Sequence, residues 1–243
     1  MEELKVTAIV LSQADLKEND KLVTLFTLEL GVIKAQLRGV KQAKSKLKFA
    51  CQPFFVGEYF LIKRNNFYQV KTVNAIESFF DLTSDFDRYL IASIMLESVK
   101  LTFKEGMINE GVFLELLKSL NSLCYSQINE KMILAKYLIN FLKLNGFELN
   151  FSTCANCGIK LTNNCHLSLT LGGFVCEVCN DNYDVVLEKN VFSSLKIISN
   201  TDVEKLSTVK LNNNIIIKCL LVLKLIFNNN FKVKLNSINN LLI

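Results

Sequence analysis

The chain has 243 residues, enough for one large domain or for two to three small ones. Hydrophobic residues make up 50% and charged residues 21%, which is typical of a globular protein and excludes a largely disordered chain. The net charge is +5 at pH 7. The N-terminal stretch MEELKVTAIVL contains no basic leader and no cleavage site, so we expect no secretory signal and a cytoplasmic location.

The first eighty residues predict a small barrel. Five stretches rich in Val, Ile, Thr, Phe and Tyr are expected to be strands, and they cover Val6–Leu11, Leu22–Leu28, Val32–Leu37, Phe54–Ile62 and Phe67–Val73. Gly31 can supply the positive φ of a tight hairpin, and Lys63–Asn66 forms a second predicted turn. Strands of this length and spacing favour an oligonucleotide-binding (OB) barrel, although an SH3-like barrel fits their number equally well.

From about residue 80 the apolar residues follow a helical period. The first predicted helix begins after Ser84 or Asp85, either of which can cap it. Further helices are expected over Val112–Leu123, Lys131–Leu144, Val191–Ile198, Thr201–Ser207 and Ile215–Phe227. Thr201 and Glu204 have the spacing of a capping box. Because the apolar run Ile215–Phe227 is too short to span a bilayer, which needs about 20 residues, we predict a buried core helix and no membrane contact.

Two Cys-x-x-Cys pairs, Cys154/Cys157 and Cys176/Cys179, stand eighteen residues apart. Because the cytoplasm is a reducing compartment, the cysteines are not expected to form disulfides. Two such turns at this spacing are typical of a tetrahedral zinc site, and four cysteine ligands leave no open position for water or substrate. We therefore predict one structural zinc per chain. Cys165 and His166, between the pairs, are expected to lie in an exposed loop.

The segment IKAQLRGVKQAKSKLKFACQPF carries six basic residues and no acid, and it lies between the third and fourth predicted strands. The six are Lys34, Arg38, Lys41, Lys44, Lys46 and Lys48. Because their charge exceeds the net charge of +5, the rest of the chain carries −1. An exposed basic loop with aromatic residues nearby is how OB barrels hold single strands, so we predict nucleic-acid contact here. Most of the aromatics are expected to fill the barrel core.

Recognised catalytic motifs are missing from the sequence. It contains neither a Gly-x-x-x-x-Gly-Lys phosphate loop nor a Gly-x-Gly-x-x-Gly motif. A single histidine leaves few routes to general-base catalysis near neutral pH. We therefore expect a protein that is not an enzyme.

Four stretches, in this order and spacing, resemble the RecO family of recombination mediator proteins. They are LKENDKLVTLFTLELGVIKAQLRGVKQAKSKL, QPF, YLINFLKLNGFELNFSTCANCG and LGGFVCEVC, and the match covers essentially the whole chain. The resemblance implies an α+β protein with an N-terminal OB barrel followed by a helical domain that contains the zinc module. We expect the barrel at 1–80, helices at 81–150 and 183–243, and the zinc module at 151–182.

The resemblance also implies a function in DNA repair and recombination. Members of this family bind single- and double-stranded DNA, anneal complementary strands and assist RecA loading on DNA coated by single-strand-binding protein, with RecR as the usual partner. Because some members lack the cysteines, zinc is not required for that work. The implied DNA contacts fall on the basic loop and on the next hairpin, at Arg38, Lys41, Lys44, Lys46, Lys48, Lys63 and Arg64.

Two other classes remain open from the residues themselves. A zinc-ribbon factor could use the barrel to bind RNA or RNA polymerase, and competition between single-stranded DNA and RNA would separate it from a DNA-binding protein. A thiol redox protein could use Cys165 or one Cys-x-x-Cys pair, and a metal and free-thiol count would separate that class, because bound zinc removes the reactive pair.

Overall fold

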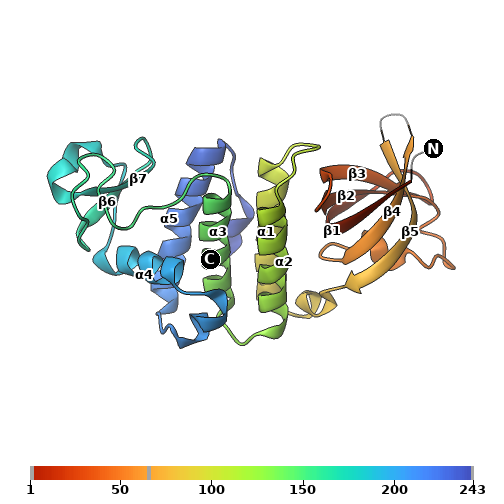
Figure 1. The fold of residues 1–243 in the computed structure, drawn as a ribbon. Coiled ribbons are helices and arrows are strands. Elements are labelled where there is room, and N and C mark those ends of the chain that lie inside the picture. Colours follow the sequence, from red (N-terminus) through yellow and green to blue (C-terminus); the bar gives the residue numbers. More distant parts are fainter. Residues whose placement is uncertain (1–2, 65–66, 242–243) are drawn as a thin grey trace. The chain divides into compact units, whose positions relative to one another are not determined.

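A computed structural model describes residues 3–64 and 67–241. The chain divides into two compact units, Met1–Cys124 and Tyr125–Ile243. The first contains a β-barrel and two helices, and the second contains three helices and the cysteine module (Figure 1). The four domain ranges expected from the sequence, 1–80, 81–150, 151–182 and 183–243, stay a prediction, because a division into compact units does not show which segments fold independently.

The first unit is built on a closed five-stranded barrel (Figure 1). Its strands are β1 (Glu3–Asp15), β2 (Lys21–Thr27), β3 (Gly31–Leu37), β4 (Val56–Arg64) and β5 (Phe67–Glu77). They close in the order β1-β2-β3-β5-β4, with β1 antiparallel to both β2 and β4 and with β3 parallel to β5. This arrangement is OB-like and confirms the predicted barrel. The expected turn at Lys63–Asn66 includes residues 65–66, which lie outside the described residues.

Alternation along the strands builds the barrel core. Val6, Ala8 and Val10 of β1 are buried on one face, because successive side chains of a strand point to opposite sides. Tyr59 of β4 is fully buried, and its hydroxyl donates to the carbonyl oxygen of Ala50 at 2.6 Å. Ala50 lies in a short 3₁₀ helix, η1 (Lys48–Cys51). This bond satisfies the one polar atom of the Tyr59 ring in an apolar interior.

Two helices complete the first unit. The 3₁₀ turn η2 (Phe80–Ser84) leads into α1 (Phe86–Thr102), and α2 (Glu110–Tyr125) follows. Asp85 is the N-cap of α1, since its carboxylate accepts from the backbone N–H of Arg88 at 3.0 Å. The ring of Phe26 on β2 lies 5.4 Å from Phe103 and 5.7 Å from Phe113, so the helices are anchored to the barrel by aromatic contacts.

Gly31 begins β3 at the point where the α1–α2 connection crosses the barrel. Its φ is +67°, which confirms the predicted positive-φ turn. A Cβ at this position would lie 2.0 Å from the carbonyl oxygen of Met107. The neighbouring Gly106 donates to the carbonyl of Val32 at 3.0 Å. Glycine is therefore needed both for its backbone conformation and for the close approach of a second backbone.

The second unit surrounds a helical core. Its helices are α3 (Glu130–Leu144), α4 (Lys189–Asn200) and α5 (Asn213–Phe231), with the 3₁₀ helices η4 (Val203–Thr208) and η5 (Ser237–Leu241). A three-stranded sheet of order β7-β6-β8 is formed by β6 (Cys165–Ser168), β7 (Gly173–Cys176) and β8 (Val185–Val186). The ring of Phe141 on α3 lies 5.6 Å from that of Phe227 on α5, so these two helices meet through aromatic contact.

The expected capping box at Thr201 and Glu204 was wrong. Thr201 is the C-cap of α4, and its hydroxyl donates to the carbonyl oxygen of Ile197 at 2.7 Å. The following 3₁₀ helix η4 has Asp202 as its N-cap, without a side-chain capping bond. The threonine hydroxyl is used by the preceding helix, because it can reach back one turn to an unpaired carbonyl.

Helix α5 is the core helix predicted from the apolar run Ile215–Phe227. Seven of its side chains are buried: Ile216, Cys219, Leu220, Val222, Leu223, Ile226 and Phe227. By length and composition alone the helix could also cross a membrane, but a core helix of a soluble protein meets the same criteria. Its contacts with α3 and α4 account for its apolar character.

Gly31 offers a test of the fold. Replacing Gly31 with Ala should lower the free energy of unfolding by more than the ~1–2 kcal/mol of a left-handed residue, since the new Cβ also meets backbone. Gly106→Ala is the matched control, because its φ of +79° is similar but a Cβ there meets nothing within 4 Å. Chemical denaturation of both variants measures the difference. Equal losses would contradict the role of the Met107 contact.

Candidate nucleic-acid interface and metal centre

The basic residues lie on an exposed loop that leaves the barrel after β3. Residues 38–47 form successive turns between β3 and η1. Arg38, Lys44, Lys46 and Lys48 are exposed, as is Lys34 on the outer face of β3. Within the described residues, neither Lys44 nor Lys46 forms a salt bridge. The two ammonium groups are therefore available to an external anion.

A carboxylate from the β1–β2 turn fixes the start of this loop. Asp20 accepts from the backbone N–H of Gly39 at 2.9 Å and from the side-chain amide of Gln36 at 2.7 Å. Gly39 has a φ of +61°, which turns the chain sharply out of the strand. The backbone N–H of Lys41 donates to the carbonyl of Asn19 at 3.1 Å. The loop thus begins from a rigid corner, and its tip remains exposed.

The hydrogen bond from Gly39 also lowers the pKa of the Asp20 carboxyl below its ordinary value. Burial opposes the shift, while Gln36 and the nearby cations Lys17 and Arg38 add to it. A carboxyl with a lowered pKa in the folded state stabilises that state above its unfolded pKa, and the effect is lost as the pH falls through the folded value. The corner is therefore fully formed at neutral pH and weakens only in acid.

Lys41 differs from the other basic residues of the loop because its ammonium is paired with a carboxylate in the described structure. Its ammonium lies 3.0 Å from a carboxylate oxygen of Asp15, at the end of β1. The same ammonium holds the pKa of Asp15 below its usual range, with a smaller contribution from Lys21. An incoming phosphate must compete with Asp15 for this lysine.

Lys63 and Arg64 lie at the end of β4, and because β5 runs parallel to β3, this hairpin points towards the start of β3 rather than towards its loop end. Lys63 pairs with Tyr68 on β5, and Tyr68 in turn pairs with Ala35 on β3. Two strand spacings amount to about 10 Å. Lys63 is exposed, and Arg64 is half-buried with an Nε atom that lacks a partner in the described structure. All seven predicted DNA-contact residues thus belong to one unit.

The aromatic residues near the loop divide into two groups. Phe54, Phe55 and Tyr59 are buried, as expected for a small barrel that fills its interior with rings. Phe49 and Phe67 keep 40% and 42% of their surface exposed, so their rings remain open to a ligand.

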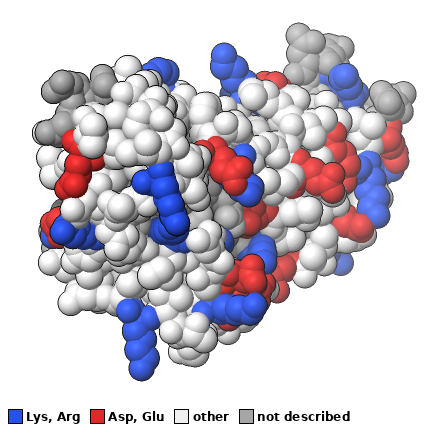
Figure 2. Space-filling model, turned by 60° about the vertical axis from the view of Figure 1, so that its left-hand side comes forward, with Lys and Arg blue, Asp and Glu red and all other residues white. Residues whose placement is uncertain are grey.

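One face of the molecule carries basic and acidic side chains in a mixed pattern. On the face shown in Figure 2, lysine and arginine side chains are intermixed with acidic ones, and most of the surface is uncharged. Such a mixed surface attracts a phosphate backbone only weakly. The colouring of this face therefore shows no continuous basic patch.

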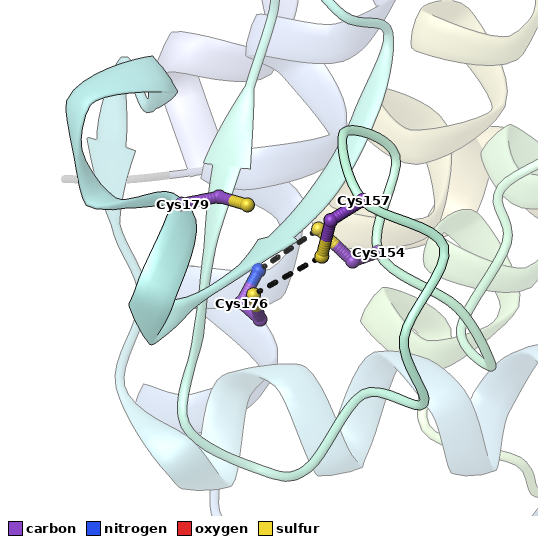
Figure 3. Close-up of side chains that lie close together, drawn as sticks. All are labelled: Cys154, Cys157, Cys176 and Cys179. Atoms are coloured by element: carbon purple, nitrogen blue, oxygen red, sulfur yellow. Dashed lines mark hydrogen bonds between the residues drawn. The ribbon is translucent and has the colours of Figure 1, made fainter.

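The four predicted cysteine ligands come together in the second unit (Figure 3). The sulfur atoms of Cys154, Cys157, Cys176 and Cys179 all lie within 4.8 Å of one another, and those of Cys157 and Cys176 are 3.7 Å apart. A tetrahedral zinc with bonds of about 2.3 Å requires sulfurs about 3.8 Å apart. The four cysteines are free thiols rather than disulfides. Their spacing therefore fits a tetrahedral metal ion.

Two tight turns aim these sulfurs at one point. Gly158, with a φ of +74°, donates its N–H to the carbonyl of Cys154 at 3.0 Å and closes the first turn. Cys176 ends β7, and the 3₁₀ helix η3 (Glu177–Asn182) carries Cys179 back towards it. The N–H of Ala155 donates to the carbonyl of Phe174 at 2.8 Å. The two halves of the site are thus joined by backbone as well as by sulfur.

The sulfurs influence one another's protonation. Burial opposes ionisation of Cys154, but backbone N–H groups of Cys157, Cys176 and Asn156 more than compensate and lower its pKa. The N–H of Ile159 favours the Cys157 thiolate, yet desolvation and the neighbouring thiols raise the pKa of Cys157 overall. Like charges this close cannot all form without a cation between them. The donor set is therefore suited to a divalent metal and unsuited to four independent thiolates.

The expectation that Cys165 and His166 lie in an exposed loop is wrong. They begin β6, where Cys165 pairs with Cys176 and His166 pairs with Val175. Cys165 is fully buried, and this burial raises the pKa of its thiol to about 12. The centroid of the His166 ring lies 4.6 Å from that of Tyr183, and the two rings are tilted by 36°. A buried, protonated thiol is a poor nucleophile, so the geometry gives no support to a redox role for Cys165.

The cysteine module rests on an aromatic cluster. The ring of Phe174, on β7, lies 5.1 Å from Phe151 and 5.1 Å from Phe192 of α4. All three rings are buried. The module is therefore packed onto the helical core of its own unit, and the four sulfurs tie the two outer turns to that base.

Comparison with known proteins agrees with this architecture. Residues 1–79 match the family model for the N-terminal part of recombination protein O, and residues 83–238 match the model for its C-terminal part. A DNA repair protein RecO from Clostridium novyi is 29% identical over 87% of this chain and 82% of its own length. Those from Caldicellulosiruptor saccharolyticus and Clostridium kluyveri are 28% and 29% identical, and the matches cover 96% and 97% of this chain and 97% and 91% of theirs.

Both matched segments correspond to what the structure contains, a barrel followed by helices and a four-cysteine module. Together the two family models account for nearly the whole chain. The chain belongs to the RecO family of DNA repair proteins.

Proposed function

We propose that the protein is a recombination mediator that binds single- and double-stranded DNA, anneals complementary strands and assists RecA loading on coated DNA. The observation that carries the proposal is the exposed basic loop held at a fixed corner of an OB-like barrel. Family membership supports the same reading. We further propose that the protein acts in the cytoplasm and needs no chemical turnover.

The loop supplies what annealing requires. Lys44 and Lys46 extend from the loop without acidic partners in the described chain, so they can neutralise phosphates and release counterions. Arg38, Lys41 and Lys48 add charge along the same segment, and Lys63 and Arg64 lie on the neighbouring hairpin. Reducing the repulsion between two phosphate backbones allows complementary bases to meet, and base pairing then supplies the free energy.

We assign a structural zinc to the four cysteines of the second unit. Bound zinc would supply a double positive charge that lets neighbouring thiolates coexist. Four sulfur ligands fill a tetrahedral ion, so the site is proposed to hold the module together rather than to carry out a reaction.

Partners are proposed from the family and from one surface feature. RecR is the expected partner, and single-strand-binding protein is the expected coat. In the second unit an apolar hollow of about 370 Å³ is lined by Val186, Leu221 and Leu225, with Lys218 and Lys224 among its walls. Lys218 is paired with Glu188 at 2.5 Å, and Lys224 donates to Asn239. This hollow is our candidate for the acidic tail of the coat protein.

The loop contacts can be tested by charge reversal. Replacing Lys44 and Lys46 together with Glu should flatten the slope of log affinity against log salt by about 1.4, since each contact to a single strand contributes about 0.7. At 0.1 M salt this corresponds to a loss of about 25-fold in affinity. Fluorescence anisotropy with single-stranded oligonucleotides of several sequences measures both quantities. RNA of the same sequence is the competitor that tests the RNA-binding alternative.

The matched control reverses two exposed lysines of the other unit, Lys210 and Lys234, which form no salt bridge within the described residues. It changes the net charge by the same amount but leaves the loop intact. The loop assignment fails if the Lys44/Lys46 double variant binds like the parent, or if both double variants lose the same affinity.

The metal assignment predicts about one zinc per chain by elemental analysis. Cys157→Ser should lose the metal and make the module sensitive to protease, because one ligand of four is removed. Cys165→Ala is the control, since Cys165 is buried close to the cluster in sequence but is not one of its members. A purified protein without metal that resists protease as well as the parent does would contradict the structural role.

Annealing should proceed without ATP and in proportion to the protein added. On strands coated by single-strand-binding protein it should require the coat protein's acidic C-terminal tail. Leu221→Asp should reduce annealing of coated strands and leave naked strands unaffected, because the new charge repels the tail. Ile197→Asp, also at an exposed apolar residue of the second unit, is the control. A requirement for ATP would overturn the mediator reading, and indifference to the tail would remove the proposed contact.

A further inference from the structure

Two hollows adjoin each other on the first unit, and their linings are chemically opposite. One has a volume of about 290 Å³, and its lining includes Phe49, Gln52, Phe54, Phe80 and Tyr89. The other has a volume of about 320 Å³ and is lined by Asp15, Lys21, Val40, Lys41, Lys48, Cys51 and Gln52. We name them the aromatic hollow and the cationic hollow. Both are close to the lower limit of small-molecule sites, about 300 Å³.

The aromatic hollow presents three accessible rings, those of Phe49, Phe80 and Tyr89, and buried rings pack against two of them. Phe49 packs on Phe55 at 5.1 Å, and Phe54 meets Tyr89 edge-on at 5.6 Å. Phe80 keeps 70% of its surface exposed, which is unusual for a large apolar side chain. The hydroxyl-bearing Ser78 and Thr83 and the two amides, Gln13 and Gln52, supply a few polar groups among the rings. Aromatic faces with scattered polar groups suit a flat heteroaromatic ring.

Phe54, the buried ring that supports Tyr89, has a strained backbone. Its φ is +72°, in the left-handed region that residues other than glycine rarely adopt. The chain here is pinned by two hydrogen bonds to β1, from Phe54 N–H to Val10 carbonyl at 3.1 Å and from Val10 N–H to Phe55 carbonyl at 2.9 Å. Strain of this kind is often found at binding sites, where surrounding structure maintains it.

The lining of the cationic hollow includes three lysines and one carboxylate. Lys21 comes from β2, Lys41 from the loop and Lys48 from η1. Lys41 is paired with Asp15 at 3.0 Å, so the lining carries a surplus of positive charge. Lys21 donates to Gln13 at 2.6 Å and Lys48 to the carbonyl of Ala43 at 3.3 Å, so both are bound to neutral oxygens. A hollow with this charge suits an anion.

The two hollows share a wall. Gln52 lines both, and Gln13 of the aromatic hollow accepts from Lys21 of the cationic one. Along β1, Gln13 and Asp15 are two residues apart and therefore point to the same side of the strand. Along η1, the consecutive residues Lys48 and Phe49 enter different hollows. An anion and an aromatic ring joined by a short linker could occupy both at once.

We propose that the two hollows form a site for one nucleotide of a single strand, with its base in the aromatic hollow and its phosphate in the cationic hollow. This inference rests on the proposed binding of single-stranded DNA and adds a place where one base is held. The charge of the cationic hollow and its continuity with the loop through Lys41 and Lys48 favour DNA over an apolar ligand. A base paired in a duplex cannot enter unless it is first extruded.

Two substitutions separate this site from the loop. Phe80→Ala should reduce affinity for oligothymidylate about tenfold, the magnitude of one lost base–aromatic stack, and should leave the affinity for an abasic strand of equal length unchanged. Phe86→Ala is the matched control, since Phe86 is 76% exposed and does not line the hollow. Asp15→Asn should raise affinity for both strands, because the phosphate no longer competes with a carboxylate for Lys41. Equilibrium binding at fixed salt measures all three variants.

Photo-crosslinking of oligothymidylate that contains 5-iodouracil locates the base independently, with peptides containing Phe49, Phe80 or Tyr89 as the expected products. The nucleotide site is overturned if Phe80→Ala binds like the parent, or if it loses equal affinity for the abasic strand. If Lys44/Lys46 reversal still weakens binding in that case, the proposed function stands. A parent protein that binds no single strand would overturn both proposals.

Discussion

Repulsion between like charges is the constraint that both functional regions of this protein must satisfy. In the first unit, basic side chains crowd onto one loop of a small barrel, and only some have partners: Lys41 has Asp15, while Lys44 and Lys46 have no salt bridge in the described structure. In the second unit, four sulfurs lie within 4.8 Å of one another. Each region holds its charge-bearing groups in place with backbone turns and leaves the compensating charge to come from elsewhere, from phosphates in one case and from a cation in the other.

Fixed backbone positions at the ends of each region lower the free-energy cost of binding. Asp20 fixes the start of the loop through Gly39, and the buried hydroxyl of Tyr59 fixes its end through Ala50. The aromatic contacts of Phe174 with Phe151 and Phe192 serve the cysteine module in the same way. Because the ends are ordered before any ligand arrives, binding needs to order only the side chains at the tip, which lowers its entropic cost.

Patterns among neighbouring residues predicted the barrel strands and the cysteine cluster well. Features that depend on strand pairing or on side-chain direction were missed. The alternation of β-branched and aromatic residues located the five strands of the barrel, Asp85 was recognised as a possible cap, and the Cys-x-x-Cys spacing located the sulfur cluster. In contrast, Lys21 was overlooked, because it lies outside the basic run and reaches the loop only through the register that pairs it with Asp15. Thr201 was assigned to the wrong helix, since its hydroxyl can serve either neighbour and only the structure shows which. Strand pairing and side-chain direction carry this information, and neither can be read from a run of residues.

The closure of the barrel has a consequence for its synthesis. The register pairs Ala8 of β1 with Gly57 of β4. During synthesis, β1 therefore cannot pair with β4 until the whole basic loop has been made. At about 5–20 residues per second this delay lasts several seconds, during which one edge of β1 lacks its partner. Loop-closure entropy grows only slowly with length, so the loop itself could lengthen with little effect on stability. The exposed edge, rather than the loop, is therefore the point at which the nascent chain is vulnerable to aggregation.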